Sequence, residues 1–151
     1  MKNKYMKVVA CAVLFMAAAL QMDAQSAKKA NVKDFITDCE KSEFVKTPKF
    51  AETMAWFNRL AEASPMVNIS SFGTSPMGRD LALVIVDKDG LTTPEAIREN
   101  GRVIVLIESC IHSGEPDGKD ATMIFLRDMV VGKKNIDVLD NVSFLCIPVF
   151  N

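Results

Sequence analysis

Three stretches decide the fold: "RVIVLIES" (Arg102–Ser109), "DGKDATMIFLRDMVVG" (Asp117–Gly132) and "NVSFLCIPVFN" (Asn141–Asn151). The first and last are short apolar runs rich in β-branched residues, which is typical of strands. The middle stretch has apolar residues at helical spacing and ends at a glycine. A strand, a helix and a second strand in this order predict a crossover unit whose two strands are parallel.

The segment before this unit adds a helix and two more strands. "TPKFAETMAWFNRLAEASP" predicts a helix with Thr47 as its N-cap, Pro48 at its first position and Pro65 after its end. Two strands follow around a turn rich in Gly, Ser and Pro, and the second of them is Leu81–Val86. The fold class that we predict is α/β: an α/β/α sandwich with a mixed, largely parallel central sheet and helices on both faces.

The N-terminus has the pattern of an export signal. Three lysines lie within the first seven residues, an apolar run covers Val8–Leu20, and the small residue Ala24 precedes a polar stretch. The apolar run is shorter than the roughly 20 residues that a membrane span needs, so a membrane anchor is the less favoured alternative. We predict a signal peptide over residues 1–24, a lead-in over 25–46, and a periplasmic or extracellular protein without a stable membrane span in its mature form.

Composition narrows the possible functions. The chain has 151 residues, of which 49% are hydrophobic and 25% charged, which is typical of one globular domain. Its formal net charge of −1 offers no basic patch, so we expect no nucleic-acid partner. Without Cys11 of the signal peptide, three cysteines remain: Cys39, Cys110 and Cys146. This odd, sparse count favours buried free thiols over a disulfide framework.

The only histidine of the chain, His112, lies in the loop after the first strand of the crossover unit, and Glu115 follows it by three residues. Gly114 lets the backbone turn tightly between them. Zinc accepts both a histidine nitrogen and a glutamate oxygen, but a catalytic zinc needs three protein ligands. The spacing by itself also fits a polar loop in which His112 caps the next helix or faces solvent. The position after a strand of an α/β sheet favours a ligand site.

Three motifs together resemble the zinc metallocarboxypeptidases (peptidase family M14). "IESCIHSGEPDGKDA" resembles the segment that carries the first two zinc ligands of that family, including its trailing Gly-Lys pair. "SPMGRDLALVIV" resembles the Gly-Arg segment before a strand, and "IPVFN" resembles a strand end that continues into Asp-Gly. The order and spacing of the three motifs agree over Phe50–Asn151.

The resemblance implies a secreted zinc metallopeptidase, a carboxypeptidase that hydrolyses peptides or proteins with a zinc-activated water. His112 and Glu115 would be ligands of one zinc ion, and Arg79 would bind substrate; a surface arginine in a turn is the alternative for Arg79. The third zinc ligand and the general base of the family lie downstream, so no catalytic residue is expected before Asn151. We therefore expect residues 47–151 to be the first part of a truncated catalytic domain, inactive by itself.

Two other functions stay open. Zinc amidoacylases of the succinylglutamate desuccinylase and aspartoacylase type share a related turn, which usually reads His-Gly-Asn-Glu. A non-catalytic exported binding module is the second alternative. A serine hydrolase is disfavoured because Ser109 and Ser113 lack a nucleophile elbow. Cys110 is more readily a core residue at a strand end, and Asp117 and Asp120 suit the negative charge preference of a helix start.

Overall fold

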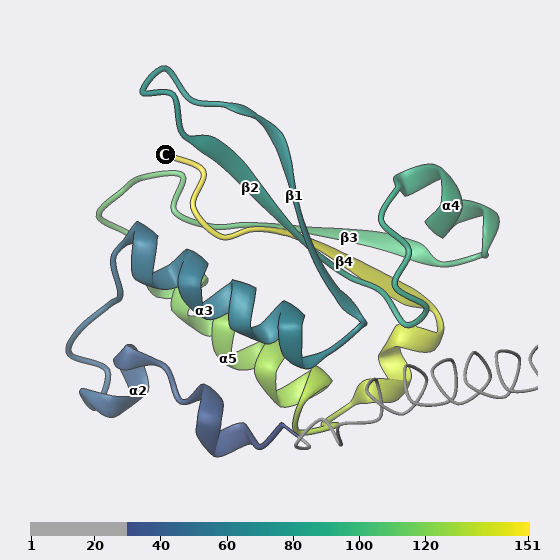
Figure 1. The fold of residues 1–151 in the computed structure, drawn as a ribbon, viewed down its shortest axis with the longest axis horizontal. Coiled ribbons are helices and arrows are strands. Elements are labelled where there is room, and N and C mark those ends of the chain that lie inside the picture. The colour runs from purple at the N-terminus through teal and green to yellow at the C-terminus, as the bar shows by residue number, and fades with distance from the viewer. Residues whose placement is uncertain (1–29) are drawn as a thin grey trace, which may run out of the picture.

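The structure is a computed structural model that describes residues 30–151, so the predicted signal peptide lies outside the described residues. Figure 1 shows its elements, which are in chain order η1 (Val32–Phe35), α2 (Asp38–Lys41), α3 (Phe50–Ala63), β1 (Val67–Thr74), β2 (Asp80–Val86), α4 (Pro94–Glu99), β3 (Val103–Glu108), α5 (Asp117–Val130), η2 (Ile136–Asp140) and β4 (Val142–Ile147). Within this part of the chain, no helix has the length and apolar character needed to cross a membrane.

The four strands form one sheet in the order β1-β2-β4-β3. β3 and β4 are parallel neighbours, paired from Val103 with Val142 to Glu108 with Ile147, which confirms the predicted crossover unit. β1 and β2 form an antiparallel hairpin, and β2 is also antiparallel to β4. The α/β class and the mixed sheet are therefore confirmed. Among the described strands the sheet is not largely parallel, because the hairpin brings β2 in against the direction of β4.

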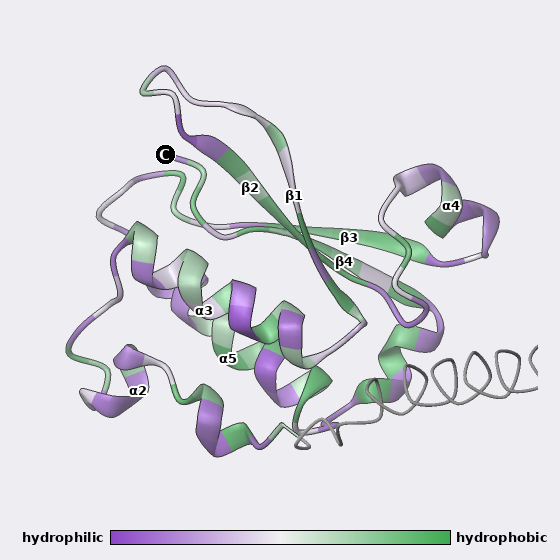
Figure 2. Ribbon diagram, viewed as in Figure 1, coloured by the Kyte–Doolittle hydropathy of each residue, from purple (hydrophilic) through white to green (hydrophobic). Residues whose placement is uncertain are grey.

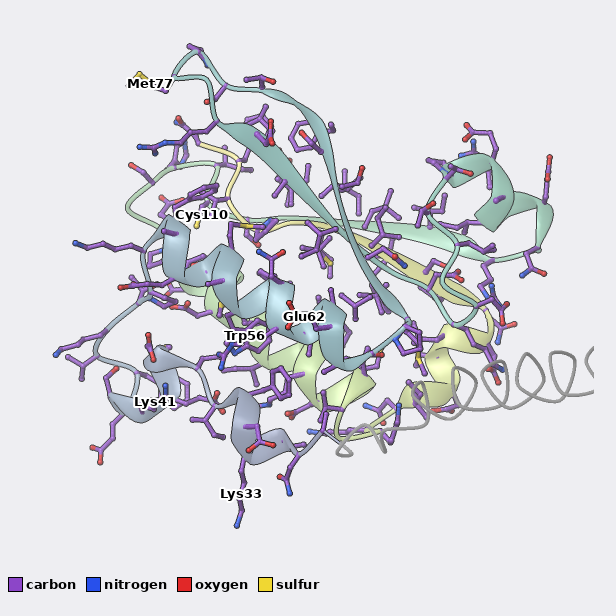
Figure 3. All side chains as sticks on the ribbon, viewed as in Figure 1. Lys33, Lys41, Trp56, Glu62, Met77 and Cys110 are labelled. Atoms are coloured by element: carbon purple, nitrogen blue, oxygen red, sulfur yellow. The ribbon has the colours of Figure 1, made fainter. Side chains whose placement is uncertain are left out.

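α3 and α5 lie side by side over one face of the sheet (Figure 1). Their apolar residues pack with those of β2 and β4 in one core, and Figure 2 shows the apolar character of these strands. Phe57 and Leu60 on α3, and Leu126 on α5, are fully buried there. Trp56 is only 4% exposed, and its indole N–H donates to the Phe35 carbonyl at 3.2 Å. Figure 3 shows it between α3 and the N-terminal segment, so the lead-in adds to the core.

β3 is less buried than its sequence suggests. Val103 is 63% exposed and Leu106 58% exposed, although both belong to a continuous apolar run. The strand order explains the difference, because β3 lies at the edge of the described sheet. α3 and α5 form one helical layer, and the short α4 lies away from them, beyond the start of β3 (Figure 1). The described residues thus show one helix-covered face of the predicted sandwich.

The start of α3 also differs from the prediction. The helix begins at Phe50 with Lys49 as its N-cap residue, so Thr47 and Pro48 lie before it. The carboxylate of Glu52 accepts the Lys49 backbone N–H at 2.7 Å, which caps the helix from its first turn. The Thr47 hydroxyl instead accepts a hydrogen bond from Lys119 at 2.7 Å. A long-range contact has replaced the local cap that the sequence suggested.

A buried polar network closes the end of the sheet where β2 finishes and β3 and β4 begin. Asp87 is completely buried, and it accepts hydrogen bonds from the Ser143 hydroxyl and from the backbone N–H groups of Asp89 (2.9 Å) and Leu91 (3.0 Å). Arg102 pairs with it at 3.2 Å. Burial alone would raise the pKa of Asp87, but these hydrogen bonds and the Arg102 charge outweigh it and lower that pKa.

Candidate metal-binding site

The loop that carries His112 lies at the carboxyl ends of β3 and β4, where the sequence placed it. Backbone hydrogen bonds continue to join the segments after β3 and β4 beyond the regular strands. Ser109 N–H donates to the Ile147 carbonyl at 2.9 Å, Phe150 N–H to the Ser109 carbonyl at 3.1 Å, and Asn151 N–H to the Cys110 carbonyl at 3.1 Å. The motifs "ESCIHSGE" and "IPVFN" are therefore neighbours in space. They lie at the carboxyl ends of the strands, which is where α/β sheets bind their ligands.

The backbone turns sharply where β3 ends. Cys110 has a φ of 51°, in the left-handed region that residues other than glycine seldom adopt. Two further contacts shape the turn: the Glu115 N–H donates to the His112 carbonyl at 3.0 Å, and the Asn151 side-chain amide donates to the Ile111 carbonyl at 3.5 Å. The turn that holds His112 and Glu115 is thus tied both within itself and to the end of β4.

His112 and Glu115 point toward each other and into solvent. The Nδ1 atom of His112 lies 3.0 Å from Oε2 of Glu115, a hydrogen-bond distance at which the imidazole N–H donates. Their side chains are 74% and 71% exposed. No other protein group hydrogen-bonds either side chain within residues 30–151, so both side chains are accessible to a ligand.

The pair fits two positions of a zinc site. Zinc holds a histidine nitrogen at about 2.0–2.1 Å and a carboxylate oxygen at about 2.0–2.2 Å, which in a tetrahedral site puts the two atoms about 3.4 Å apart. The observed 3.0 Å is close to that separation and would need only a small side-chain movement. Among the described residues, no group of three or more His, Cys, Asp and Glu side chains is gathered as a metal site. His112 and Glu115 could therefore supply two of the ligands that a zinc ion needs, and further ligands would be required.

The start of α5 fixes the other side of the turn. A Cβ at Gly118 would lie 3.3 Å from the Ser109 hydroxyl oxygen, so glycine lets the helix approach the end of β3 closely. Lys119 is 3% exposed, and its ammonium group contacts Thr47, Pro48 and Asp120. In the sequence, the Gly-Lys pair stands out only through the resemblance to the carboxypeptidase motif. No local pattern in the sequence pointed to these contacts.

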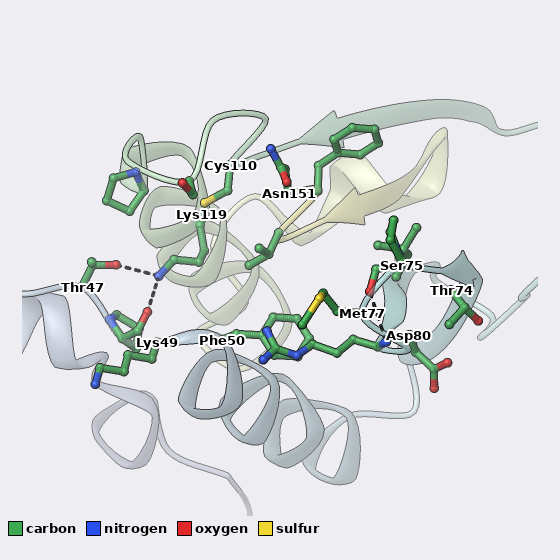
Figure 4. Close-up of a pocket in the computed structure, with 18 residues that line it drawn as sticks. Thr47, Lys49, Phe50, Thr74, Ser75, Met77, Asp80, Cys110, Lys119 and Asn151 are labelled. Atoms are coloured by element: carbon green, nitrogen blue, oxygen red, sulfur yellow. Dashed lines mark hydrogen bonds between the residues drawn. The ribbon is translucent and has the colours of Figure 1, made fainter.

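Arg79 lies in a pocket that the loop of His112 and Glu115 also borders. The pocket has a volume of about 730 Å³ and is bordered by the start of α3, the β1–β2 turn, the loop before α5 and the end of the chain (Figure 4). Ser113 and Lys119 line it, whereas His112 and Glu115 do not. The guanidinium carbon of Arg79 lies 6.0 Å from the Phe50 ring centroid, at the limit of a cation–π contact. The turn that presents Arg79 is closed by its own backbone carbonyl, which accepts the Ser75 N–H at 2.8 Å.

Within residues 30–151 the three cysteines are free thiols and are buried, as the composition predicted. Burial raises the pKa of the Cys110 thiol, while the Lys119 charge acts in the opposite direction. Burial raises the pKa of Cys146 to about 12. Thiols in this condition stay protonated at neutral pH and are poor nucleophiles. We therefore assign Cys110 a structural role in the turn after β3 and not the role of a nucleophile.

Comparison with known proteins bears on the family and the fold of the chain. The zinc carboxypeptidase family matches residues 53–151. The fold resembles the carboxypeptidase A from Helicoverpa armigera, with a TM-score of 0.59 and 21% identity over 69% of this chain and 24% of that one. It also resembles a putative carboxypeptidase A from Shewanella denitrificans OS-217, with a TM-score of 0.53 and 20% identity over 68% of this chain and 25% of that one. No curated protein matches the chain.

The chain spans about a quarter of the length of these two structures, and at this identity they show a shared fold. The family match is more specific, because it covers about two thirds of the chain and includes all three motifs: the Arg79 turn, the His112 loop and the end of β4. These motifs meet at one end of the sheet. This protein belongs to the zinc carboxypeptidase family.

Proposed function

We propose that the protein is an exported zinc-dependent metallocarboxypeptidase, in which His112 and Glu115 are two of the zinc ligands. The observation that carries the proposal is the His112–Glu115 pair, 3.0 Å apart and exposed at the carboxyl ends of two parallel strands. Family membership supports zinc as the metal and a peptide or protein as the substrate. The complete site includes at least one further ligand and a general base in addition to these two residues.

The residues described here have limited and separate roles in this proposal. His112 would give a neutral imidazole nitrogen and Glu115 a carboxylate oxygen to the ion. The bound zinc would supply polarisation of the scissile carbonyl and a more acidic water. Arg79, across the pocket from Ser113, would bind a carboxylate or carbonyl oxygen of the substrate, because its guanidinium presents a planar set of donors. Asn151 and Gly118 would hold the backbone of the ligand turn.

Export is proposed on the N-terminal sequence alone. The charged start, the apolar run Val8–Leu20 and the small residue Ala24 form the pattern of a signal peptide. Mass spectrometry of the mature N-terminus after expression in a secreting host tests this, and a mature protein that begins near Gln25 is the expected result. Retention of Met1 on protein found only in the cytosol would rule the proposal of export out.

The metal assignment is tested by zinc content in the full-length protein. We expect one zinc per molecule in the wild type, and loss of both zinc and peptidase activity in His112→Ala. Ser113→Ala is the matched control for zinc content, because Ser113 lies on the same exposed turn between the two proposed ligands and should keep the bound zinc. A His112→Ala protein that keeps stoichiometric zinc would eliminate the assignment. A zinc-bound wild type that cleaves no C-terminal residue from a peptide library would instead favour a binding module.

A further inference from the structure

Lys119 is a buried lysine in the first turn of a helix, a combination that is unusual. It is the third residue of α5, where the helix dipole disfavours positive charge, and its side chain is 4% exposed. Lysine is rarely buried this completely unless it is paired. Lys119 follows the proposed metal ligand Glu115 by four residues in the chain, and only Pro116 separates Glu115 from the start of α5.

All three ammonium protons of Lys119 have an acceptor. The Nζ atom lies 2.7 Å from the Thr47 hydroxyl oxygen, 3.2 Å from the Pro48 carbonyl oxygen and 2.7 Å from Oδ1 of Asp120. Figure 4 shows the bond from Lys119 to Thr47 across the pocket wall. The Asp120 carboxylate balances the charge, and the other two acceptors belong to a segment more than 70 residues earlier in the chain. The side chain therefore joins two distant segments.

The two joined segments lead directly to the proposed functional groups. On one side, the Pro116 carbonyl accepts the Asp120 N–H at 3.1 Å, so the first turn of α5 starts directly after Glu115. On the other side, Thr47 and Pro48 lead into Phe50, whose ring lies beside the Arg79 guanidinium. One buried ammonium group thus connects the proposed ligand turn with the wall of the pocket that carries Arg79.

We propose that Lys119 is a positioning residue, whose buried ammonium group clamps the turn of His112 and Glu115 to the segment before α3 and thereby holds the proposed metal ligands in place. This inference rests on the proposed function for its effect on zinc. The clamp itself is independent of zinc, because it consists of contacts within the protein. Its loss should loosen the turn, expose Cys110 behind it, and weaken metal binding.

The test compares variants of the full-length protein by two measurements. The first is the rate at which Cys110 is alkylated in the metal-free protein, resolved by peptide mass spectrometry with the deeply buried Cys146 as internal reference. The second is zinc affinity, measured by competition with a chelator. Lys119→Met should alkylate faster at Cys110 and bind zinc about tenfold more weakly, in the range of losses seen when groups supporting a ligand are removed. Cys110 is buried in the folded protein, so faster alkylation reports easier access to its thiol.

Matched variants separate the clamp from general stability. Thr47→Val keeps the side-chain shape but removes the acceptor, whereas Thr47→Ser keeps the hydroxyl; the first should shift both measurements in the direction of Lys119→Met, and the second should match the wild type. Thr47 is exposed, so this pair decides the question even where Lys119→Met does not fold. Lys134→Met, at an exposed lysine beyond α5, controls for the substitution itself.

The outcomes are distinct. The clamp is refuted when Lys119→Met and Thr47→Val both stay within about twofold of the wild type in alkylation and zinc affinity, below the effect expected of a group that supports a ligand. A fall in melting temperature alone, with both readouts unchanged, also refutes it. Where His112→Ala shows that zinc binds elsewhere, the proposed function fails, and the alkylation rates of Cys110 still decide whether Lys119 clamps the turn.

Discussion

Asp87 and the His112–Glu115 pair lie at opposite ends of the sheet and differ in burial and in hydrogen bonding. At the end around Asp87, the carboxylate is fully buried and accepts bonds from a hydroxyl, two backbone N–H groups and an arginine. At the end around His112, the imidazole and the Glu115 carboxylate are more than 70% exposed and have only each other. The buried Asp87 carboxylate, with its four partners, stabilises the fold, while the exposed His112–Glu115 pair is accessible to a ligand. The comparison predicts that substitutions at the two ends will damage different properties.

The largest effect on stability is expected at Asp87. Asp87→Ala leaves the buried Ser143 hydroxyl without its acceptor and leaves buried Arg102 with Asp89 as its remaining carboxylate partner, which should lower the free energy of unfolding by about 3–5 kcal/mol. Urea unfolding followed by circular dichroism measures this. The contrast between the two ends would be lost if the variant unfolded within about 1 kcal/mol of the wild type, the range of an exposed pair.

The largest effect on metal binding is expected at Glu115. Because Glu115 would be a direct ligand, Glu115→Ala should weaken zinc binding by more than about 100-fold, beyond the loss expected for groups that only support a ligand. Its free energy of unfolding without zinc should stay within about 0.5 kcal/mol of the wild type, because the side chain is exposed. Chelator competition and urea unfolding on the same preparation provide both values. A variant that is strongly destabilised yet still binds zinc would reverse the proposed division of roles.

The loss of stability at low pH should depend on Asp87. The pKa of Asp87 lies below its ordinary value of 3.8 in the folded protein, so its ionised form contributes stability above pH 3.8, and this contribution is lost as pH falls through the folded pKa. Stability should therefore fall below about pH 4 in the wild type and fall less steeply in Asp87→Asn. Unfolding free energies between pH 5 and the acid transition, at about half-unit steps, measure the slopes. Parallel slopes would show that Asp87 does not contribute to the acid transition.

The smallest effect is expected for a surface pair near the same end. Lys88 and Asp140 form an ion pair whose side chains are about half exposed. Lys88→Met should change the free energy of unfolding by less than about 1 kcal/mol, and salt should reduce the difference further. A loss as large as that of Asp87→Ala would mean that burial is not what separates strong from weak charge contacts here.

The sequence predicted the part of the fold that depends on local pattern. The apolar runs that became β3 and β4, the helical spacing of α5 and the glycine that ends its stretch predicted a parallel crossover, and β3 and β4 pair accordingly. The same pattern placed the His112 loop at the correct end of the sheet. These features depend on residues close in sequence and on the handedness of connections, which is general.

Features that depend on distant partners were predicted wrongly or not at all. The exposure of β3 depends on the strand order, which no single strand encodes. Thr47 is a sound N-cap by its residue type, yet Lys119 takes its hydroxyl and the helix starts later. The position of Arg79 beside Phe50 likewise results from the packing of a hairpin against α3. The sequence shows which residue types favour a cap or a turn. The fold alone decides which of several acceptors a buried donor reaches.

The left-handed backbone of Cys110 has a consequence for the entropy of binding. Such a φ costs a residue other than glycine about 1–2 kcal/mol, and the strand pairing on either side maintains it. The backbone at the start of the His112 turn is therefore held in one conformation before any ligand binds. Fixing a free backbone residue costs about 1–2 kcal/mol of conformational entropy. Because folding has already fixed the backbone at Cys110, an ion that binds His112 does not have to order this residue.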